Sequence, residues 1–233
     1  SAFIVTISES MKNILIETRR LPENKVSVVY NWQNESKFIV SDSTKSESDK
    51  KFKFMYLGSI NRLANIDSLL TAFNQAKLNN SEFIVAGEGS EKENLINFVN
   101  KSKLKNIKFL SFDPKNIGEI QSSSDVLVLS LKKGASSYAF PSKIPAYMFS
   151  AKPILAFIDI PSEIFNTIKT SNCGWCIDVS DITSLALKME YISNKPKEKL
   201  RKLGNNGRVF ALNNLSSKEN LKKITSIIEL SIK

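Results

Sequence analysis

Residues Gly134–Asp159 read GASSYAFPSKIPAYMFSAKPILAFID. The pattern predicts a loop of small residues, a short helix opened by Pro141 and Ser142, and a buried strand that begins at Pro153. Proline is tolerated at the first helical position, because its missing N–H would have no partner there. The other free N–H groups of that turn, the positive end of the helix and the charge of Lys143 favour a bound phosphate. This stretch therefore predicts a diphosphate-binding site and indicates a nucleotide-linked substrate.

Strands and helices alternate along the remaining sequence. The strands are short, rich in β-branched or aromatic residues and bounded by Gly, Asp or Ser, as buried parallel strands are. Amphipathic segments such as Ile66–Leu78 and Glu91–Ser102 lie between them. The predicted strands are Phe3–Ile7, Lys25–Tyr30, Lys53–Leu57, Glu82–Ala86, Ile107–Leu110, Val126–Leu131, Pro153–Ile158 and Trp175–Val179. We therefore expect an α/β protein with a Rossmann-like, doubly wound parallel sheet.

A polar segment divides the chain. Residues 35–51, ESKFIVSDSTKSESDKK, have no hydrophobic period, and so long a loop is uncommon inside a compact domain. We interpret this segment as a linker or an exposed loop. It separates residues 1–34 from a main body, 52–212, and the pattern predicts a final helix within 213–233.

The composition narrows the class of partner. The hydrophobic share of 42% in 233 residues is enough for a sizeable core. The net charge is +10, but only five of the 33 basic residues are Arg, and Lys is scattered among Asn, Ser and Ile. We interpret this as compositional bias with solvated Lys faces, in preference to a dedicated anion-binding surface. No nucleic-acid-binding motif is present, so nucleic acid is not expected as a partner.

The location follows from what the sequence lacks. No apolar run reaches the roughly 18 residues that a membrane span needs, and the sequence starts with the apolar AFIVTI without a basic leader. We therefore expect a cytoplasmic protein. Arg19, Arg20 and the Lys-rich faces leave open a peripheral position on the inner face of the membrane.

The two cysteines, Cys173 and Cys176, form a Cys-Gly-Trp-Cys pair. A thioredoxin-like redox pair needs its first Cys at the start of a helix that follows a strand. Here the order is reversed, because a helix at about Ser162–Thr170 precedes the pair and a strand follows. We expect structural thiols. With two cysteines and no His in the chain, a zinc site is not expected.

Two predicted strands end in glycine turns. Gly58 follows the strand at Lys53–Leu57, and Gly87 and Gly89 follow the strand at Glu82–Ala86. At the carboxyl end of such strands, glycine lets the backbone approach a phosphate closely. For Gly87 and Gly89, a tight turn into the next helix is an equally good interpretation.

The segment PSKIPAYMFSAKPIL, which begins at Pro141, resembles the Pro-Ser-Lys…Tyr…Gly-Lys-Pro-Ile signature of family 4 retaining glycosyltransferases with the GT-B fold. The likeness is greatest to a bacterial O-antigen and capsule subgroup that includes N-acetyl-fucosaminyltransferase-like enzymes. Five further segments resemble this family in the order that it requires. They are residues 4–32, 53–73, 83–89, 107–114 and 124–130.

The resemblance covers essentially the whole chain and implies the C-terminal, donor-binding half of a two-domain enzyme. Residues 1–34 would be a remnant of the N-terminal domain with the interdomain segment. Residues 52–212 would be the nucleotide-sugar-binding domain, and 213–233 the helix that returns toward the N-terminal domain. The residues expected to bind the donor are Gly58, Ser59, Asn61, Arg62, Gly87, Gly89, Phe112, Pro141, Ser142 and Lys143. No catalytic residue is assigned.

The same resemblance implies a hexosyltransferase-type reaction with retention at the anomeric carbon, in bacterial surface polysaccharide synthesis. It implies no metal and no other cofactor, and the donor would be a UDP-linked sugar. The isolated chain would bind this donor but transfer nothing. The acceptor site would belong to the missing N-terminal domain or to a separate subunit, and the acceptor could be lipid-linked at the membrane surface.

The sequence departs from the family's pattern at four positions. Tyr138 and Ala146 stand where many members have two Glu that contact the sugar and the ribose. Ser59 and Ala64 stand where many have an Arg and a Lys that bind the diphosphate. None of these four roles carries over to this chain.

Arg62 and Lys143 are the cations available as replacements, and each charged hydrogen bond is worth about 1.5–3 kcal/mol. The alternative is a degenerate Rossmann-like domain that acts as a non-catalytic binding or scaffolding module. The surviving glycine turns favour the enzyme over that alternative. A P-loop NTPase is excluded because no Gly-Lys-Ser/Thr loop exists, and the absence of a Gly-x-Gly-x-x-Gly turn disfavours a nicotinamide dehydrogenase.

Overall fold

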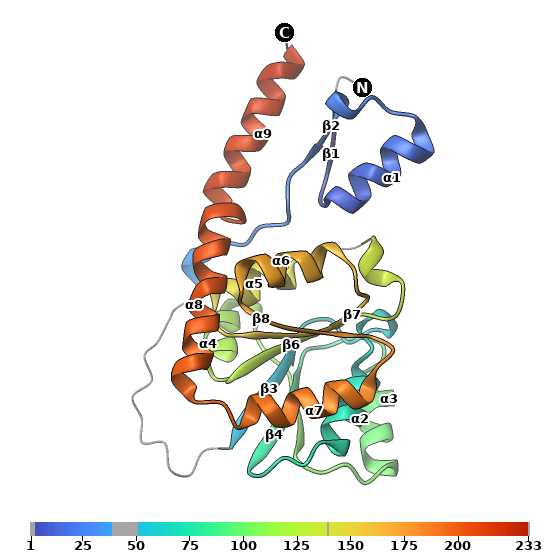
Figure 1. Ribbon diagram of the computed structural model, residues 1–233, viewed down its shortest axis with the longest axis vertical. Helices are drawn as coiled ribbons and strands as arrows, with labels where there is room; N and C mark the ends of the chain where they lie inside the picture. Colours follow the sequence, from blue (N-terminus) through green and yellow to red (C-terminus); the bar gives the residue numbers. More distant parts are fainter. Residues whose placement is uncertain (1–2, 39–50, 139, 233) are drawn as a thin grey trace.

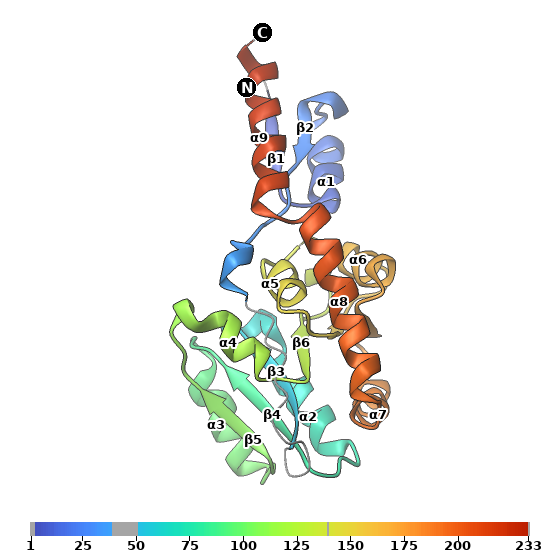
Figure 2. The ribbon, with the colours of Figure 1, turned by 90° about the vertical axis from the view of Figure 1, so that its left-hand side faces the viewer.

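The computed structural model describes residues 3–38, 51–138 and 140–232. A six-stranded sheet with helices on both faces forms the main body, and a smaller two-stranded unit lies at the same end of the molecule as the final helix (Figures 1 and 2). Most of the predicted linker, residues 39–50, lies outside the described residues.

The large sheet is entirely parallel, in the order β5-β4-β3-β6-β7-β8. Its strands are β3 (Phe52–Leu57), β4 (Ser81–Ala86), β5 (Ile107–Leu110), β6 (Val126–Ser130), β7 (Ile154–Ile158) and β8 (Gly174–Asp178). Counted from β3, this is the 3-2-1-4-5-6 order of the Rossmann fold. The predicted α/β class and doubly wound sheet are confirmed.

The helices cover the two faces of the sheet (Figure 1). On one face lie α2 (Ile66–Gln75), α3 (Lys92–Lys101) and α7 (Ile182–Ser193). On the other lie α4 (Ile117–Ser122), α5 (Lys143–Phe149) and α6 (Glu163–Ser171), while α8 (Lys197–Asn214) contributes to both clusters. The last described helix, α9 (Ser217–Ile232), follows directly.

The central strand β3 serves both faces because successive side chains of a strand point to opposite sides. Phe54 and Tyr56 join the cluster under α2, α3 and α7, and Met55 and Leu57 join the cluster under α4, α5 and α6. All four are buried. Such continuous apolar strands are typical of parallel sheets covered on both sides.

The first two predicted strands form a unit of their own. β1 (Ile4–Thr6) and β2 (Val26–Val28) pair in parallel, and α1 (Glu9–Arg19) connects them. The Glu163 carboxylate at the start of α6 accepts the backbone N–H groups of Glu9 and Ser10, at 3.1 and 3.2 Å. A carboxylate is favoured at a helix N-terminus, so this contact ties the small unit to the main body.

The segment after β2 also packs onto the main body. The Asn31 side-chain amide donates to the carbonyl of Phe140 at 2.9 Å, and the rings of Tyr30 and Phe140 lie 5.0 Å apart. Phe38 is only 2% exposed and stacks on Phe149. The start of the segment predicted as an exposed loop therefore contributes to the core.

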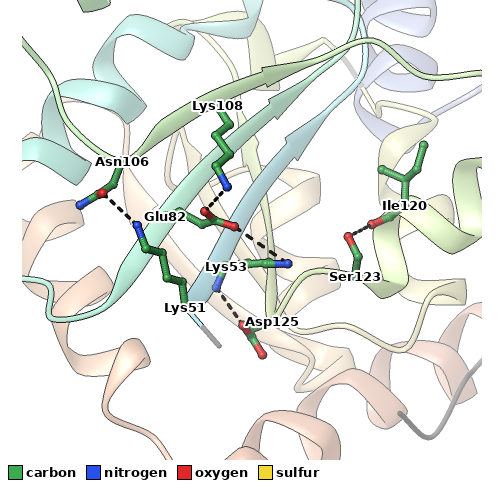
Figure 3. A network of polar contacts seen from close by, with 8 residues as sticks. All are labelled: Lys51, Lys53, Glu82, Asn106, Lys108, Ile120, Ser123 and Asp125. Carbon is green, nitrogen blue, oxygen red and sulfur yellow. Dashed lines mark hydrogen bonds and ion pairs between the residues drawn. The ribbon is translucent and has the colours of Figure 1, made fainter. Parts of the chain in front are cut away.

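A network of charged side chains lies at the amino-terminal edge of the sheet (Figure 3). The buried Glu82 carboxylate pairs with Lys108 at 2.7 Å and with Lys53 at 3.9 Å. Asp125, just before β6, accepts the Lys53 backbone N–H at 2.8 Å. Burying an unpaired carboxylate is unfavourable. The two lysines therefore stabilise the buried Glu82 carboxylate, and the network has a structural role.

Two further expectations concern the cysteines and Pro141. Cys173 is buried and Cys176 is half-buried, both as free thiols, and burial raises the pKa of Cys173 to about 11 and that of Cys176 to about 12; their structural role stays a prediction. Pro141 is not in the first helical position, since α5 begins at Lys143. The Ile144 N–H bonds instead to the carbonyl of Pro141 at 3.0 Å, so a separate tight turn leads into the helix.

Within the described residues, no helix combines the length and the apolar character that crossing a bilayer requires. In the same residues, no three potential metal-binding side chains of His, Cys, Asp or Glu gather at one place.

The contact between β3 and β6 is short. Their ladder joins only Phe54 to Val126 and Met55 to Leu127, whereas β3 and β4 pair along six residues. Beyond this ladder, the buried Tyr147 hydroxyl accepts the Leu57 N–H and donates to the Leu57 carbonyl, both at 3.0 Å. Burial raises the pKa of Tyr147. One hydroxyl thus fastens α5 to the central strand.

Replacing Tyr147 with Phe should lower the free energy of unfolding by about 1–3 kcal/mol, because the Leu57 N–H would lose its partner. Urea denaturation followed by circular dichroism measures the change. The half-exposed Tyr191 is a matched control, and Tyr191→Phe should stay within about 0.5 kcal/mol of the wild type. Equal stability of Tyr147→Phe and Tyr191→Phe would contradict the role of the buried hydroxyl.

Candidate functional site

The strand order of the large sheet reverses between β3 and β6. In open parallel sheets, ligands bind outside the carboxyl ends of the strands at such a switch point. The loop that begins at Gly58 leaves β3 at this edge, and the segment that leads to Lys143 leaves β6 there. The topology therefore brings together two of the motifs that the sequence analysis singled out.

The side chain of Lys143 extends across the carboxyl edge of the sheet, from one face to the other. It begins α5 on one face, while its ammonium nitrogen lies 2.7 Å from the hydroxyl of Tyr56, whose side chain belongs to the opposite face. The path runs over Gly58, where a Cβ atom would stand 2.1 Å from the Lys143 Cε. Glycine is favoured here because its φ of +141° is a conformation that other residues rarely adopt, and a Cβ would in addition displace the end of the Lys143 side chain.

Lys143 is a half-buried cation. Its ammonium nitrogen also lies 4.5 Å from the centre of the Tyr56 ring, and burial lowers its pKa to about 8. Among the described residues, no carboxylate forms an ion pair with it. A desolvated positive charge without an anion is unfavourable, so the site favours an anionic ligand.

The helix position of Lys143 depends on Tyr147. The two residues are four apart and therefore lie on the same face of α5. Since the Tyr147 hydroxyl is bonded to the Leu57 backbone, the first turn of α5 is held against the carboxyl end of β3. Tyr147 was part of the quoted motif, but its spacing alone does not reveal this contact.

Gly87 and Gly89 serve packing. A Cβ on Gly87 would stand 2.0 Å from the carbonyl oxygen of Gly58, and one on Gly89 would stand 2.1 Å from that of Ile60. The Ile60 N–H donates to the Glu88 carbonyl at 2.8 Å. The loops after β3 and β4 are therefore bonded side by side, which accounts for both glycines as a close turn. A contact between these glycines and a donor stays a prediction.

Arg62 lies away from the site formed by Lys143 and Gly58. Its Nε pairs with the Glu91 carboxylate at 3.2 Å, and its side chain is 82% exposed. Together with Asn61 it lines a pocket of about 270 Å³ between the loop after β3 and helices α2 and α3, and Lys143 is not part of that lining. The structure thus brings Lys143, but not Arg62, onto Gly58.

The other predicted donor-binding residues lie near the carboxyl edge of the sheet, and they differ in exposure and in their hydrogen-bond partners. Ser59 is exposed, its hydroxyl accepts the Asn61 side-chain amide at 3.2 Å, and its carbonyl accepts the Tyr56 hydroxyl at 2.6 Å. Ser142 is exposed beside α5. Phe112 is half-buried and packs on the cluster under α4 and α5, and its contact with a donor stays a prediction.

Asp159, at the end of β7, organises the loop before α5. Its carboxylate accepts the backbone N–H groups of Gly134 at 2.8 Å and Ser136 at 3.3 Å, and the Ser136 hydroxyl as well. Burial raises the pKa of Asp159, but these hydrogen bonds outweigh it and hold the pKa below its usual range. Tyr138, at a position where many family members have Glu, is 60% exposed in this loop.

The parallel sheet with its flanking helices is a Rossmann-type domain that matches GT-B glycosyltransferase structures. The chain belongs to the family of group 1 glycosyl transferases, whose model matches residues 40–210. WbjE of Pseudomonas aeruginosa, a probable glycosyltransferase, is 26% identical over 142 residues, which are 60% of this chain and 35% of that protein.

Two solved structures illustrate the shared fold. A glycosyltransferase from Rickettsia africae ESF-5 has a TM-score of 0.83 at 18% identity, over 99% of this chain and 64% of its own. Alr3699/HepE of Anabaena, in complex with UDP and glucose, has a TM-score of 0.83 at 15% identity, over 98% of this chain and 63% of its own. The chain spans only part of each of these relatives.

Replacing Gly87 with Ala should lower the free energy of unfolding by roughly 2–4 kcal/mol, since the new methyl would meet the Gly58 carbonyl and strain the backbone. Chemical denaturation measures the loss. Gly134 also has a positive φ, of 85°, but a Cβ at this residue would meet no atom within 4 Å, so Gly134→Ala should lose only about 1–2 kcal/mol. Equal losses in the two variants would argue against the clash.

Proposed function

We propose that this chain is the donor-binding half of a retaining glycosyltransferase that acts in bacterial surface polysaccharide synthesis. The observation that carries the proposal is the ammonium of Lys143, held over Gly58 at the switch point without an ion-pair partner among the described residues. A diphosphate at this edge would supply the missing negative charge. Membership in the group 1 glycosyl transferases supports a sugar donor as the source of that diphosphate.

Lys143 would contribute to both binding and reaction. A charged hydrogen bond from Lys143 to a phosphate oxygen is worth about 1.5–3 kcal/mol, which corresponds to roughly 10- to 150-fold in affinity. In the reaction, the same charge would stabilise the departing nucleoside diphosphate. Arg62 contributes less to this proposal, because its guanidinium is already paired with Glu91. No general base or nucleophile is assigned.

We propose a UDP-linked donor. Support comes from the fold relative whose structure contains UDP and glucose, together with the sequence resemblance to the O-antigen and capsule subgroup. The acceptor site would be supplied by an N-terminal domain or a separate subunit, and a lipid-linked acceptor would place the enzyme at the inner face of the membrane. We expect no metal to be needed and no transfer by this chain alone.

The second candidate is a non-catalytic scaffolding module, and one observation favours it. Glycine turns at the ends of β3 and β4 favour a donor site over a scaffold only where packing gives no other reason for glycine. Gly87 and Gly89 are fully explained by the close approach of the loop after β3, so their presence no longer separates the two candidates. Lys143 does separate them, because a scaffold has no need of a desolvated cation at the switch point.

Calorimetric titrations of the chain with UDP, GDP and ADP test the proposal. We expect one nucleotide to bind with a dissociation constant between micromolar and sub-millimolar, and Lys143→Ala to weaken it at least tenfold. Lys133→Ala is the matched control, since it removes an equal charge from the exposed loop after β6. Absence of binding by all three nucleotides, or equal effects of the two substitutions, would favour the scaffolding module.

The affinity should also depend on pH. A bound diphosphate favours the charged form of Lys143, whose pKa in the free protein is lowered by burial to about 8. The association constant should therefore be highest below pH 8 and fall as the pH rises above it, by up to about tenfold per pH unit. Titrations between pH 6.5 and 9.5 measure this, and a flat profile in the wild type would speak against Lys143 as the ligand.

A further inference from the structure

Tyr56 is a buried tyrosine whose hydroxyl bonds to both Ser59 and Lys143. We propose that this hydroxyl is a positioning group that holds Lys143 and the loop after β3 in the arrangement that receives the diphosphate. The inference rests on the proposed function of Lys143. It assigns to Tyr56 a role that acts through Lys143.

The direction of the hydrogen bonds at Tyr56 is unambiguous. The Ser59 carbonyl can only accept, and a charged lysine ammonium can only donate. The Tyr56 hydroxyl therefore donates to Ser59, at 2.6 Å, and accepts from Lys143, at 2.7 Å. Phenylalanine at this position would leave both neighbours without that partner.

These two hydrogen bonds join the two sides of the switch point. Ser59 belongs to the loop after β3, and Lys143 belongs to the first turn of α5 on the opposite face of the sheet. The Tyr56 ring is fixed because the whole side chain is buried in the core under α2 and α7. The rigid ring therefore sets the distance between the loop and the lysine.

The arrangement leaves the lysine able to bind. An ammonium has three donors, and Tyr56 accepts one of them. A free lysine on a surface loses up to about 2 kcal/mol of side-chain entropy when a ligand fixes it. Lys143 is already confined by Tyr56 and by the backbone at Gly58, so a phosphate would meet a preorganised donor.

A purely structural role makes a different prediction from a positioning role. If Tyr56 only fills the core, removing its hydroxyl lowers stability and leaves the proton equilibrium of Lys143 unchanged. If Tyr56 positions Lys143, removing the hydroxyl takes away a partner of the charged form, so Lys143 loses its proton at a lower pH. The two roles are therefore separated by a pH profile.

The first experiment measures UDP binding between pH 6.5 and 9.5 for the wild type, Tyr56→Phe and Tyr191→Phe. We expect Tyr56→Phe to bind UDP about five- to tenfold more weakly at pH 7, and its affinity to begin falling at least about half a pH unit below that of the wild type. Tyr191→Phe, on the half-exposed face of α7, should match the wild type. An unshifted profile in a folded Tyr56→Phe protein would overturn the inference.

A second experiment needs no ligand. The ¹³Cε resonance of Lys143, identified by its loss in Lys143→Ala, reports protonation of the ammonium in the free protein. Its midpoint should lie at lower pH in Tyr56→Phe than in the wild type, and equal midpoints would overturn the positioning role. If the midpoint shifts but the wild type binds no nucleotide, the proposed function fails while the link between Tyr56 and Lys143 stands.

Discussion

The hydroxyl of Tyr147 joins helix α5 to the central strand β3. The ladder between β3 and β6 joins only two residue pairs, and the backbone of Leu57 lies beyond it. Buried backbone groups need partners, and the Tyr147 hydroxyl serves the Leu57 N–H and carbonyl together. Because Lys143 lies one turn earlier on the same face of α5, the bond that completes the sheet also places the cation of the candidate site.

The two edges of the sheet differ in how their buried charged groups are paired. At the amino-terminal edge, Glu82 is paired with two lysines on neighbouring strands (Figure 3). At the carboxyl edge, Lys143 has a hydroxyl and an aromatic ring as partners, but no carboxylate among the described residues. The first arrangement neutralises its charge within the fold, and the second has no negative partner within the described part of the chain. This contrast favours a binding role for the carboxyl edge.

The small β1–α1–β2 unit is connected to the same edge. Glu163 caps the start of α1, and the Asn31 amide bonds to Phe140, directly before Pro141. The carbonyl of Phe140 therefore lies between the N-terminal segment and the turn that leads to Lys143.

The sequence by itself determined the eight strands, the parallel class and the resemblance to family 4 glycosyltransferases, because period, β-branching and turn residues are local properties. The tertiary structure alone decided that Gly87 and Gly89 pack on the loop after β3 and that Arg62 pairs with Glu91. It also decided that Tyr56 meets Lys143, 87 residues away. Such contacts depend on how separate strands and helices are placed side by side, and no local pattern along the chain encodes those distances.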